Sequence, residues 1–300
     1  MSSGVAQQAN FRAPRASPLT QSHPRLRVAF QGEPGAFSEE AAVKLLGGEI
    51  ETVPRATFEA MFAAIADGAD LVLAPVENSL AGSVYRCYDL LLESKLSITA
   101  EVILPIAHNL IGPPGATIGQ VRFVQSHPVA LAQCTRFFEA HPGITRVAAE
   151  DTGGSVREVV RAGDPQRAAI ASRRAAEIYA GCILQSHLED HRQNYTRFVL
   201  LSPEPGVPAG ANKISLVVFL WHQPGALHQA LEPIAREKIN LVKIESRPIV
   251  GHPFEYCFYL DLMAPPQAPG AQAALEELRR RAREVRILGC YVAAPPPTSS

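Results

Sequence analysis

The chain has 300 residues, a formal net charge of −1 and an apolar fraction of 47%. This length allows two domains at roughly 100–200 residues each, and the balanced charge gives no reason to expect a nucleic-acid or membrane surface. The five cysteines are scattered without a C-x-x-C pair, which indicates free thiols in a reducing compartment and no metal site. No apolar run reaches the roughly 18 residues of a transmembrane helix. Residues 1–24 lack the apolar core of a secretory signal, so we expect a cytoplasmic protein with a disordered leader there.

Strand, turn and helix alternate at the start of the chain. Residues 26–30 predict a strand, residues 31–38 a Gly/Pro turn, and residues 39–46 a helix with Ser38 as its N-cap. A strand, a glycine turn and a helix start together form an anion site. Because the turn does not match G-x-G-x-x-G, it does not predict a dinucleotide. Taken alone, the turn predicts local structure only.

The next elements continue this pattern. Residues 50–53 and 71–76 read as strands, with a helix over residues 57–67 between them. The order β-α-β-α-β favours a mainly parallel sheet with helices on both faces, and such sheets bind ligands beyond the carboxyl ends of their strands. Three polar residues follow directly after the third strand: Glu77, Asn78 and Ser79. They are candidate substrate-binding residues, or they serve helix capping and turn chemistry.

A second lobe is predicted after residues 97–110, which are mostly extended. Three further strands follow, each with a turn and a helix behind it, over residues 121–125, 145–149 and 167–171. The turns place polar side chains at helix starts: His127, Thr152 and Ser155. Two lobes with facing turns would enclose a small anion in the cleft between them. For His127 two roles stay open, a second hydrogen-bond donor or a turn residue before Pro128.

A polar pair precedes the last strand of this part. Residues 198–201 are an apolar run typical of a buried strand, and Thr196 and Arg197 stand just before it. Arg offers a rigid fork of donors that matches a carboxylate, and Thr offers a small, orientable hydroxyl. The pair suits an anionic substrate that gains or loses an oxygen. The alternative is a strand start with two solvated polar residues.

A proline-rich break then separates this part from a different pattern. We expect two lobes over residues 25–202, a linker over 203–211, a C-terminal domain over 212–292 and a disordered tail over 293–300. The predicted elements of the C-terminal domain follow the order β-α-β-β-α-β, which is the ferredoxin-like unit. Edge strands of such small units often pair with a second copy. A homodimer or homotetramer is therefore expected.

Six motifs stand in a fixed order along the chain. They are residues 31–38 (QGEPGAFS), 75–84 (PVENSLAGSV), 126–134 (SHPVALAQC), 194–198 (NYTRF), 224–227 (PGAL) and 243–248 (KIESRP). Together they resemble prephenate dehydratase with a C-terminal ACT regulatory domain, over roughly residues 25–292. The resemblance implies a two-lobed, mainly parallel α/β catalytic part, similar to periplasmic binding proteins, followed by a ferredoxin-like ACT domain.

The resemblance also implies a reaction. The family decarboxylates and dehydrates prephenate to phenylpyruvate in phenylalanine biosynthesis, and it needs no cofactor because the product ring is aromatic. Thr196 matches the family's threonine that donates to the departing hydroxide, and Arg197 is the expected bidentate ligand of a carboxylate. Glu77 is expected to pair with Arg197 or to face a hydroxyl, because an unpaired buried carboxylate is costly. The expected substrate-binding residues are Ser38, Glu77, Asn78, Ser79, His127, Thr152, Ser155 and Phe198.

By the same resemblance, the ACT domain senses a small molecule, with phenylalanine as the expected feedback ligand. Gly225, Ala226 and Leu227 open a helix whose N–H groups suit a carboxylate. The opposite wall, across a dimer interface, is expected from four further residues: Asn240, Glu245, Ser246 and Arg247. The alternative is a purely structural dimerisation domain.

Three other functions stay open at this stage. Residues 86–90 and the turn at residues 151–154 resemble relatives that use arogenate and make phenylalanine directly. Gly153 and Gly154 replace alanines that are usual in the family, which affects the shape of the pocket wall. A second possibility is a non-catalytic solute-binding or amino-acid-sensing protein, and a third is a transcriptional regulator, although no basic recognition helix is visible.

Overall fold

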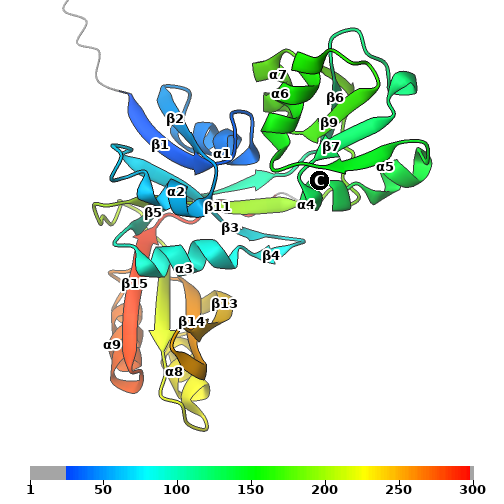
Figure 1. Cartoon of the computed structure of the whole chain (residues 1–300). Coiled ribbons are helices and arrows are strands. Elements are labelled where there is room, and N and C mark those ends of the chain that lie inside the picture. The colour runs from blue at the N-terminus through cyan, green and yellow to red at the C-terminus, as the bar shows by residue number, and fades with distance from the viewer. Residues whose placement is uncertain (1–24, 298–300) are drawn as a thin grey trace, which may run out of the picture.

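The computed structural model describes residues 25–297. Figure 1 shows two α/β lobes, with a third body below the first lobe in this view. The predicted leader over residues 1–24 and the last three residues of the predicted tail lie outside the described residues. The chain passes between the two lobes twice, in residues 106–108 and again in residues 186–194.

The first lobe contains a mixed sheet with the strand order β5-β11-β3-β1-β2. Its strands are β1 (Leu26–Gln31), β2 (Ile50–Arg55), β3 (Leu71–Asn78), β5 (Ser97–Pro105) and β11 (Tyr195–Ser202), with β4 (Gly82–Ser83) paired to the end of β3. Its helices are α1 (Phe37–Leu46), α2 (Phe58–Ala63) and α3 (Tyr85–Glu93). Strands β1, β2 and β3 are parallel, as predicted, whereas β11 is antiparallel to both β3 and β5.

The second lobe contains a five-stranded sheet with the order β10-β6-β9-β7-β8. Its strands are β6 (Asn109–Gly112), β7 (Phe123–Ser126), β8 (Thr145–Ala148), β9 (Arg167–Ala171) and β10 (Cys182–Gln185). Its helices are η1 (Ile118–Gln120), α4 (Pro128–Ala132), α5 (Thr135–Ala140), α6 (Thr152–Ala162) and α7 (Arg173–Tyr179). The single helix expected after His127 is two short helices, with a break at Gln133 and Cys134.

The third body, which we name the C-terminal module, has the predicted β-α-β-β-α-β order. It consists of β12 (Lys213–Phe219), α8 (Ala226–Arg236), β13 (Asn240–Ile249), β14 (His252–Met263), α9 (Pro269–Arg281) and β15 (Glu284–Tyr291). Its strands are ordered β13-β14-β12-β15, and both helices pack on one face of them. The opposite face packs against α3 and the first lobe (Figure 1).

The module and the first lobe are joined by a strand pairing that requires a glycine. Strand β15 pairs with β5 at Gly289 and Ile98. A β-carbon at Gly289 would lie 2.1 Å from the Ile98 carbonyl oxygen, so no side chain fits there. The two sheets therefore form one continuous ten-stranded sheet.

Strand β11 has a covered face on each side of the sheet. Phe198 and Leu200 belong to the apolar cluster under α1, whereas Val199 and Leu201 belong to the cluster that includes α2, α3 and the module. Side chains alternate between the faces of a strand. The predicted apolar run is thus a strand buried on both faces, and neighbouring residues along it point in opposite directions.

The start of α1 differs from the prediction. Its N-cap is Ala36, without a side-chain cap, and Ser38 lies inside the first turn. The helix begins early because Gly35 adopts a φ of 88°, which favours glycine, and Ala36 donates its N–H to the Glu33 carbonyl at 3.0 Å. This earlier start points Ser38 toward the space between the lobes.

Candidate active site

A cavity of about 420 Å³ lies between the two lobes. It is lined by residues from the ends of β1, β3 and β11, from the starts of α1, α4 and α6, and from the first crossing between the lobes. The lining residues are Gln31, Gly32, Ala36, Phe37, Ser38, Phe58, Asn78, Ala81, Val84, Ile106, His108, His127, Val129, Ala130, Gln133, Glu150, Asp151, Thr152 and Thr196. The structure therefore brings five predicted site residues together: Ser38, Asn78, His127, Thr152 and Thr196.

Asn78 holds the Thr196 hydroxyl at the wall of this cavity. The two residues are register partners in β3 and β11, and Asn78 Nδ2 donates to Thr196 Oγ1 at 3.0 Å. The N–H groups of Leu80 and Ala81 donate to Asn78 Oδ1 at 3.0 and 2.8 Å, which fixes the orientation of the amide. Because Thr196 accepts the bond from Asn78, its own hydrogen can be donated to a ligand in the cavity.

A second set of polar side chains continues from this pair into the second lobe. Asn78 also donates to Asn194 Oδ1 at 2.8 Å, and Asn194 Nδ2 donates to Gln133 Oε1 at 2.9 Å. His108 Nε2 lies 2.9 Å from the same Gln133 oxygen. Burial lowers the pKa of His108 below its ordinary value of 6.5, although the bond to Gln133 and the charge of Glu189 oppose this shift. The imidazole is therefore neutral near pH 7 and donates from Nε2.

These residues extend what the sequence predicted. His108 falls in the segment predicted to be extended, residues 97–110, and Gln133 and Asn194 belong to two of the six motifs, but the sequence alone assigned no role to these three residues. Their position next to apolar strands could have indicated a role, because polar side chains that are buried there need hydrogen-bond partners. His108 and Asn194 are 2% and 0% exposed.

The second lobe contributes helix starts. His127 is the N-cap of α4, and its Nδ1 accepts a hydrogen bond from the Val129 N–H at 3.2 Å, so it acts as a turn residue while also lining the cavity. Asp151 caps α6 through Gly154 N at 2.6 Å. Burial raises the pKa of Asp151 above its ordinary value of 3.8, against the effect of that hydrogen bond. Ser155 is buried behind this turn and donates to the Asp151 carbonyl at 2.7 Å, outside the cavity lining.

The lobes touch along one rim of the cavity. Ser172 Oγ donates to the Gly35 carbonyl at 2.7 Å, and Arg174 pairs with Glu39 at 3.0 Å. A β-carbon at Gly153 would lie 2.6 Å from the Pro34 carbonyl oxygen. The glycine that departs from the family's usual alanine therefore allows α6 to approach the first lobe closely.

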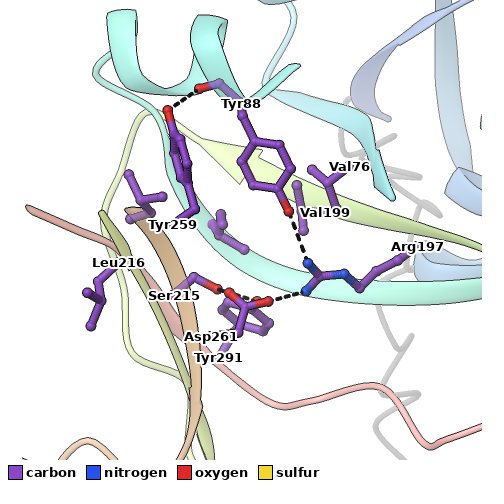
Figure 2. Close-up of a pocket in the computed structure, with 11 residues that line it drawn as sticks. Val76, Tyr88, Arg197, Val199, Ser215, Leu216, Tyr259, Asp261 and Tyr291 are labelled. Atoms are coloured by element: carbon purple, nitrogen blue, oxygen red, sulfur yellow. Dashed lines mark hydrogen bonds and ion pairs between the residues drawn. The ribbon is translucent and has the colours of Figure 1, made fainter. Parts of the chain in front are cut away.

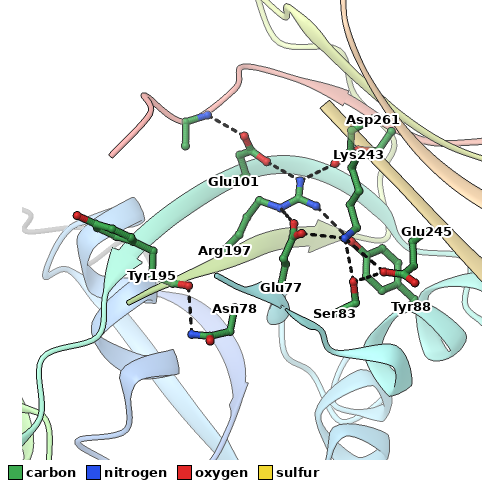
Figure 3. Close-up of polar contacts among 12 residues, drawn as sticks. Glu77, Asn78, Ser83, Tyr88, Glu101, Tyr195, Arg197, Lys243, Glu245 and Asp261 are labelled. Atoms are coloured by element: carbon green, nitrogen blue, oxygen red, sulfur yellow. Dashed lines mark hydrogen bonds and ion pairs between the residues drawn. The ribbon is translucent and has the colours of Figure 1, made fainter. Parts of the chain in front are cut away.

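Arg197 does not lie in the cavity. It follows Thr196 on a strand, so its side chain points to the opposite face, where Nη1 donates to Asp261 at 2.7 Å (Figure 2). The same Nη1 donates to Glu101 at 3.2 Å (Figure 3). A hollow beside it measures about 10 Å³, which is about the space of one water and too small for a substrate. The expectation that Arg197 holds a substrate carboxylate does not agree with this position.

Three other predicted site residues also lie outside the cavity lining. Glu77 points the same way as Arg197, with its Oε2 at 3.4 Å from Arg197 Nε, which agrees with the expected pairing of the two (Figure 3). Ser79 Oγ donates to the Gln193 carbonyl at 3.0 Å and accepts from Tyr195 N at 2.9 Å, which ties the β3–β4 turn to β11. Phe198 is a core residue under α1, 2% exposed.

The predicted sensor residues fall on two faces of the module. Gly225 is the N-cap of α8 with a φ of 78°, and Ala226 and Leu227 line a hollow of about 160 Å³ with Trp221 and Tyr256. Asn240 begins β13, and Ser246 pairs with Phe258 on the face covered by the helices.

Glu245 and Arg247 face the first lobe instead. The Ser83 hydroxyl donates to Glu245 Oε2 at 2.5 Å, and Arg247 Nη2 donates to Asp89 Oδ2 at 2.7 Å. Within one chain, these two residues therefore form contacts between the module and the lobe, and they do not form a wall with Gly225.

The geometry of this cavity defines a class of protein. Two α/β lobes enclose a cavity whose polar groups are amides, hydroxyls and imidazoles at strand ends and helix starts, with two carboxylates at one turn. Within residues 25–297, no lysine or arginine lines the cavity. The same residues contain no group of His, Cys, Asp or Glu that could hold a metal ion, and no helix long and apolar enough to span a membrane. This is a cleft for a small molecule between two lobes.

Comparison with known proteins places the chain in a family. The model of the family described as prephenate dehydratase matches residues 28–206. The arogenate dehydratase/prephenate dehydratase 1 of Arabidopsis thaliana, a chloroplastic protein, is 42% identical over 284 residues, which cover 89% of this chain and 72% of the relative. The chain belongs to the prephenate dehydratase family and is an enzyme of that family.

Two solved structures are similar over almost the whole chain. A prephenate dehydratase from Arthrobacter aurescens, described in complex with L-Phe, has a TM-score of 0.81 at 29% identity and covers 89% of this chain and 90% of that one. A protein described as GqqA, a novel type of quorum quenching acylase, has a TM-score of 0.83 at 36% identity and covers 90% of this chain and 98% of that one. Both alignments are long enough to include the C-terminal module.

Proposed function

We propose that the chain converts prephenate to phenylpyruvate, water and CO2 in the cavity between the lobes. The observation that carries this proposal is the Thr196 hydroxyl, which Asn78 fixes at the cavity wall with its hydrogen available. In the reaction, the electron pair of the bond between the ring and its carboxylate moves through the ring and expels the hydroxide at the opposite carbon. CO2 and hydroxide leave, the ring becomes aromatic, and the hydroxide takes a proton to become water.

Thr196 donates to the departing oxygen. A threonine hydroxyl is too weak an acid to transfer its proton freely at neutral pH, so its role is a preorganised hydrogen bond that strengthens as negative charge develops. One such donor is typically responsible for about 10²–10³ in rate. The Asn78 amide, itself fixed by two backbone N–H groups, keeps the hydroxyl from rotating away.

The start of α1 binds a carboxylate of the substrate in this proposal. The first N–H groups of a helix have no partners within it, and the helix dipole favours negative charge there. Phe37 and Ser38 belong to this first turn and line the cavity, and Ser38 adds a hydroxyl. Thr152 at the start of α6 is the matching group from the second lobe. In this proposal, these neutral donors bind the substrate carboxylate that Arg197 was expected to bind.

Arogenate is the alternative substrate, and one observation favours it. Arogenate carries an ammonium group where prephenate carries a ketone, and Glu150 and Asp151 place carboxylates in the cavity lining. Side-by-side assays separate the two, with phenylpyruvate measured by its absorbance in alkali and phenylalanine by amino-acid analysis. If Glu150 contacts the ammonium group, Glu150→Gln lowers kcat/KM for arogenate about tenfold more than for prephenate. An unchanged ratio removes Glu150 from substrate selection.

An acylase activity, as described for GqqA, is the competing reaction. A threonine nucleophile needs a general base within hydrogen-bond reach. The partner of Thr196 is the NH2 group of Asn78, which is a donor, and His108 Nε2 is directed at Gln133. This geometry supports dehydration over acyl transfer. Release of free fatty acid from an acylated lactone by the wild-type protein, without turnover of prephenate or arogenate, would reverse that choice.

We further propose that the C-terminal module is an ACT domain that binds phenylalanine and pairs with a second copy in the cytoplasm. L-Phe in the Arthrobacter aurescens structure supports the ligand. The hollow at the α8 start supports a site, with Ala226 and Leu227 in its lining. Strand β13 is an edge of the sheet, and its Val242 and Ile244 are 47% and 46% exposed, which suits a partner strand.

Calorimetry with L-phenylalanine and light scattering at several protein concentrations test these points separately. Leu227→Asp should abolish the binding heat without changing turnover in the absence of phenylalanine. Ile244→Lys should shift the protein toward monomer. Full binding by the first variant, or an unchanged mass for the second, would remove the corresponding proposal.

A further inference from the structure

Two neighbouring strands divide their polar side chains between the cavity and the C-terminal module. In the register of β3 and β11, Asn78 is the partner of Thr196, and Glu77 is the partner of Arg197. Asn78 and Thr196 line the cavity. Glu77 and Arg197, one peptide bond away in each strand, point to the module (Figure 3).

The module holds both outward-pointing residues by charge. Arg197 Nη1 donates to Asp261 of β14 at 2.7 Å, and Lys243 of β13 donates to Glu77 Oε1 at 3.0 Å. Lys213 of β12 donates to Glu101 at 2.9 Å, and Glu101 also accepts from Arg197. The group thus joins three cations to four carboxylates: Arg197, Lys213, Lys243, Glu77, Glu101, Asp261 and, at 3.8 Å from Lys243, Glu245.

Because these charged side chains are buried, their contacts favour one placement of the C-terminal module against the first lobe. The side chains of Arg197, Asp261 and Lys243 are 11%, 8% and 7% exposed. Burial alone would raise the pKa of Asp261, but Arg197 and Lys213 hold it below its ordinary value of 3.8, so the carboxylate is charged.

A shift of the module that separated Arg197 from Asp261 would break the shortest ion pair of both residues. Within residues 25–297, Arg197 would keep only Glu101 and Glu77 of the first lobe as ion-pair partners. Asp261 would keep only Lys213, at 3.8 Å, in the same part of the chain. Loss of a partner at a buried charge is strongly unfavourable.

The strands are irregular at this point. The register between β11 and β3 shifts between Arg197 and Phe198, so Val76 is an extra residue on β3. Such bulges re-aim side chains and are common next to active sites. Here the bulge directly precedes Glu77 and Asn78, and Lys243 and Asp261 hold Glu77 and Arg197, the register pair next to the bulge.

We propose that Arg197 is a positioning residue: its ion pair with Asp261, together with the Glu77–Lys243 pair, fixes Thr196 and Asn78 in the cavity and couples the placement of the C-terminal module to turnover. This inference rests on the proposed dehydratase function of the cavity. Movement of the module reaches the catalytic hydroxyl through one peptide bond on each strand. Any ligand that shifts the module would act on kcat through this connection.

The test compares two ion pairs that join the module to the first lobe. Asp261→Asn removes the partner of Arg197, and Asp261 contacts no residue of the cavity lining. Asp89→Asn is the matched control, because Asp89 pairs with Arg247 at 2.7 Å across the same interface but lies on α3, away from β3 and β11. Both variants are assayed as the full chain without phenylalanine.

We expect Asp261→Asn to lower kcat at least tenfold with KM changed less than threefold, while Asp89→Asn changes kcat less than twofold. If Asp261→Asn is not recovered folded, Arg197→Lys takes its place with the same expected split, because lysine keeps the charge but loses the fork that reaches Asp261 and Tyr88 together. Normal kcat in a folded variant, or equal losses in variant and control, would overturn the proposal.

Hydrogen exchange gives a readout that does not depend on the reaction. The amides of residues 76–79 and 194–197 should exchange faster in Asp261→Asn than in Asp89→Asn. If the wild-type protein turns over neither prephenate nor arogenate, the proposed function fails, while this difference in exchange still decides the coupling. Equal exchange in both variants would show that the module does not position these strands.

Discussion

The two faces of strands β3 and β11 carry polar groups of different kinds. On the cavity side, Asn78 and Thr196 are neutral and joined by a 3.0 Å hydrogen bond. On the side of the C-terminal module, Glu77 and Arg197 belong to a group of buried charges. The two pairs are neighbours in the register of the same two strands, and the alternation of side chains along a strand directs them to opposite faces.

The difference matches what each face must do. A fixed neutral donor stabilises charge that develops during the reaction. It therefore binds the transition state more strongly than the bound substrate, which is what raises the rate. A buried charge, in contrast, requires a compensating partner and so specifies one arrangement of the bodies that supply it. The cavity side of the strands is therefore suited to catalysis, and the module side to alignment.

Removal of the cavity-side hydroxyl should have the largest effect. Thr196→Ala is expected to lower kcat at least about a hundredfold, because no other group replaces the donor to the departing oxygen. The measurement is phenylpyruvate absorbance in alkali after incubation with prephenate. Thr196→Ser keeps the hydroxyl and should retain most of the activity. Near-normal turnover of the alanine variant would refute the assigned role.

A smaller effect is expected where the lobes touch. In Gly153→Ala the new β-carbon would lie 2.6 Å from the Pro34 carbonyl oxygen and 3.2 Å from Ala36 N, so the lobes must separate slightly. Overpacking of this kind typically destabilises the packed arrangement by about 1–3 kcal/mol. Because the close approach of the lobes shapes the cavity that binds the substrate, we expect KM to rise about tenfold. Gly143→Ala is the control, because a β-carbon there meets nothing within 4 Å. Equal kinetics of the two variants would show that this contact does not shape the cavity.

The protonation state of His108 in the cavity lining can be tested through the pH dependence of stability. His108 is neutral in the folded protein because burial lowers its pKa below 6.5, whereas the unfolded chain takes up a proton near that value. Its contribution to stability is therefore complete above pH 6.5 and is lost as the pH falls below it, by at most about 1.4 kcal/mol per pH unit. Denaturant unfolding between pH 5 and 7.5 should show a smaller dependence for His108→Gln. Identical slopes would mean that His108 is not held neutral.

An exposed ion pair supplies the smallest expected effect and a reference for the buried ones. Arg86 and Glu59 lie 2.7 Å apart, but their side chains are 44% and 54% exposed. Water screens such pairs, so Glu59→Gln should leave the melting temperature and kcat unchanged within error. A drop in kcat comparable with that of Asp261→Asn would show that exposed and buried ion pairs affect turnover equally, which contradicts the proposed role of burial.

Much of the fold followed from local patterns. The apolar run at residues 198–201, the alternation of strands and helices, and the β-α-β-β-α-β order of the C-terminal module were all readable, because each depends on residues close in the sequence. Asn78, Thr152 and Thr196 meet in one cavity, as expected of residues at strand ends and helix starts.

The role of Arg197 was not readable from its chemistry. Arginine suits a carboxylate, which suggested a substrate ligand, but adjacent strand residues point to opposite faces. With Thr196 assigned to the cavity, strand alternation already places Arg197 on the other side. Its partner Asp261 is 64 residues away in sequence, so only the packing of the module against the lobe could reveal the pair.

A crystal structure with an unreactive prephenate analogue bound would test the division between the two faces most directly. We expect the hydroxyl of the analogue at about 2.7–3.0 Å from Thr196 Oγ1, its carboxylates at the helix starts, and Arg197 still paired with Asp261. An Arg197 side chain turned into the cavity and bound to a carboxylate of the analogue would contradict that division.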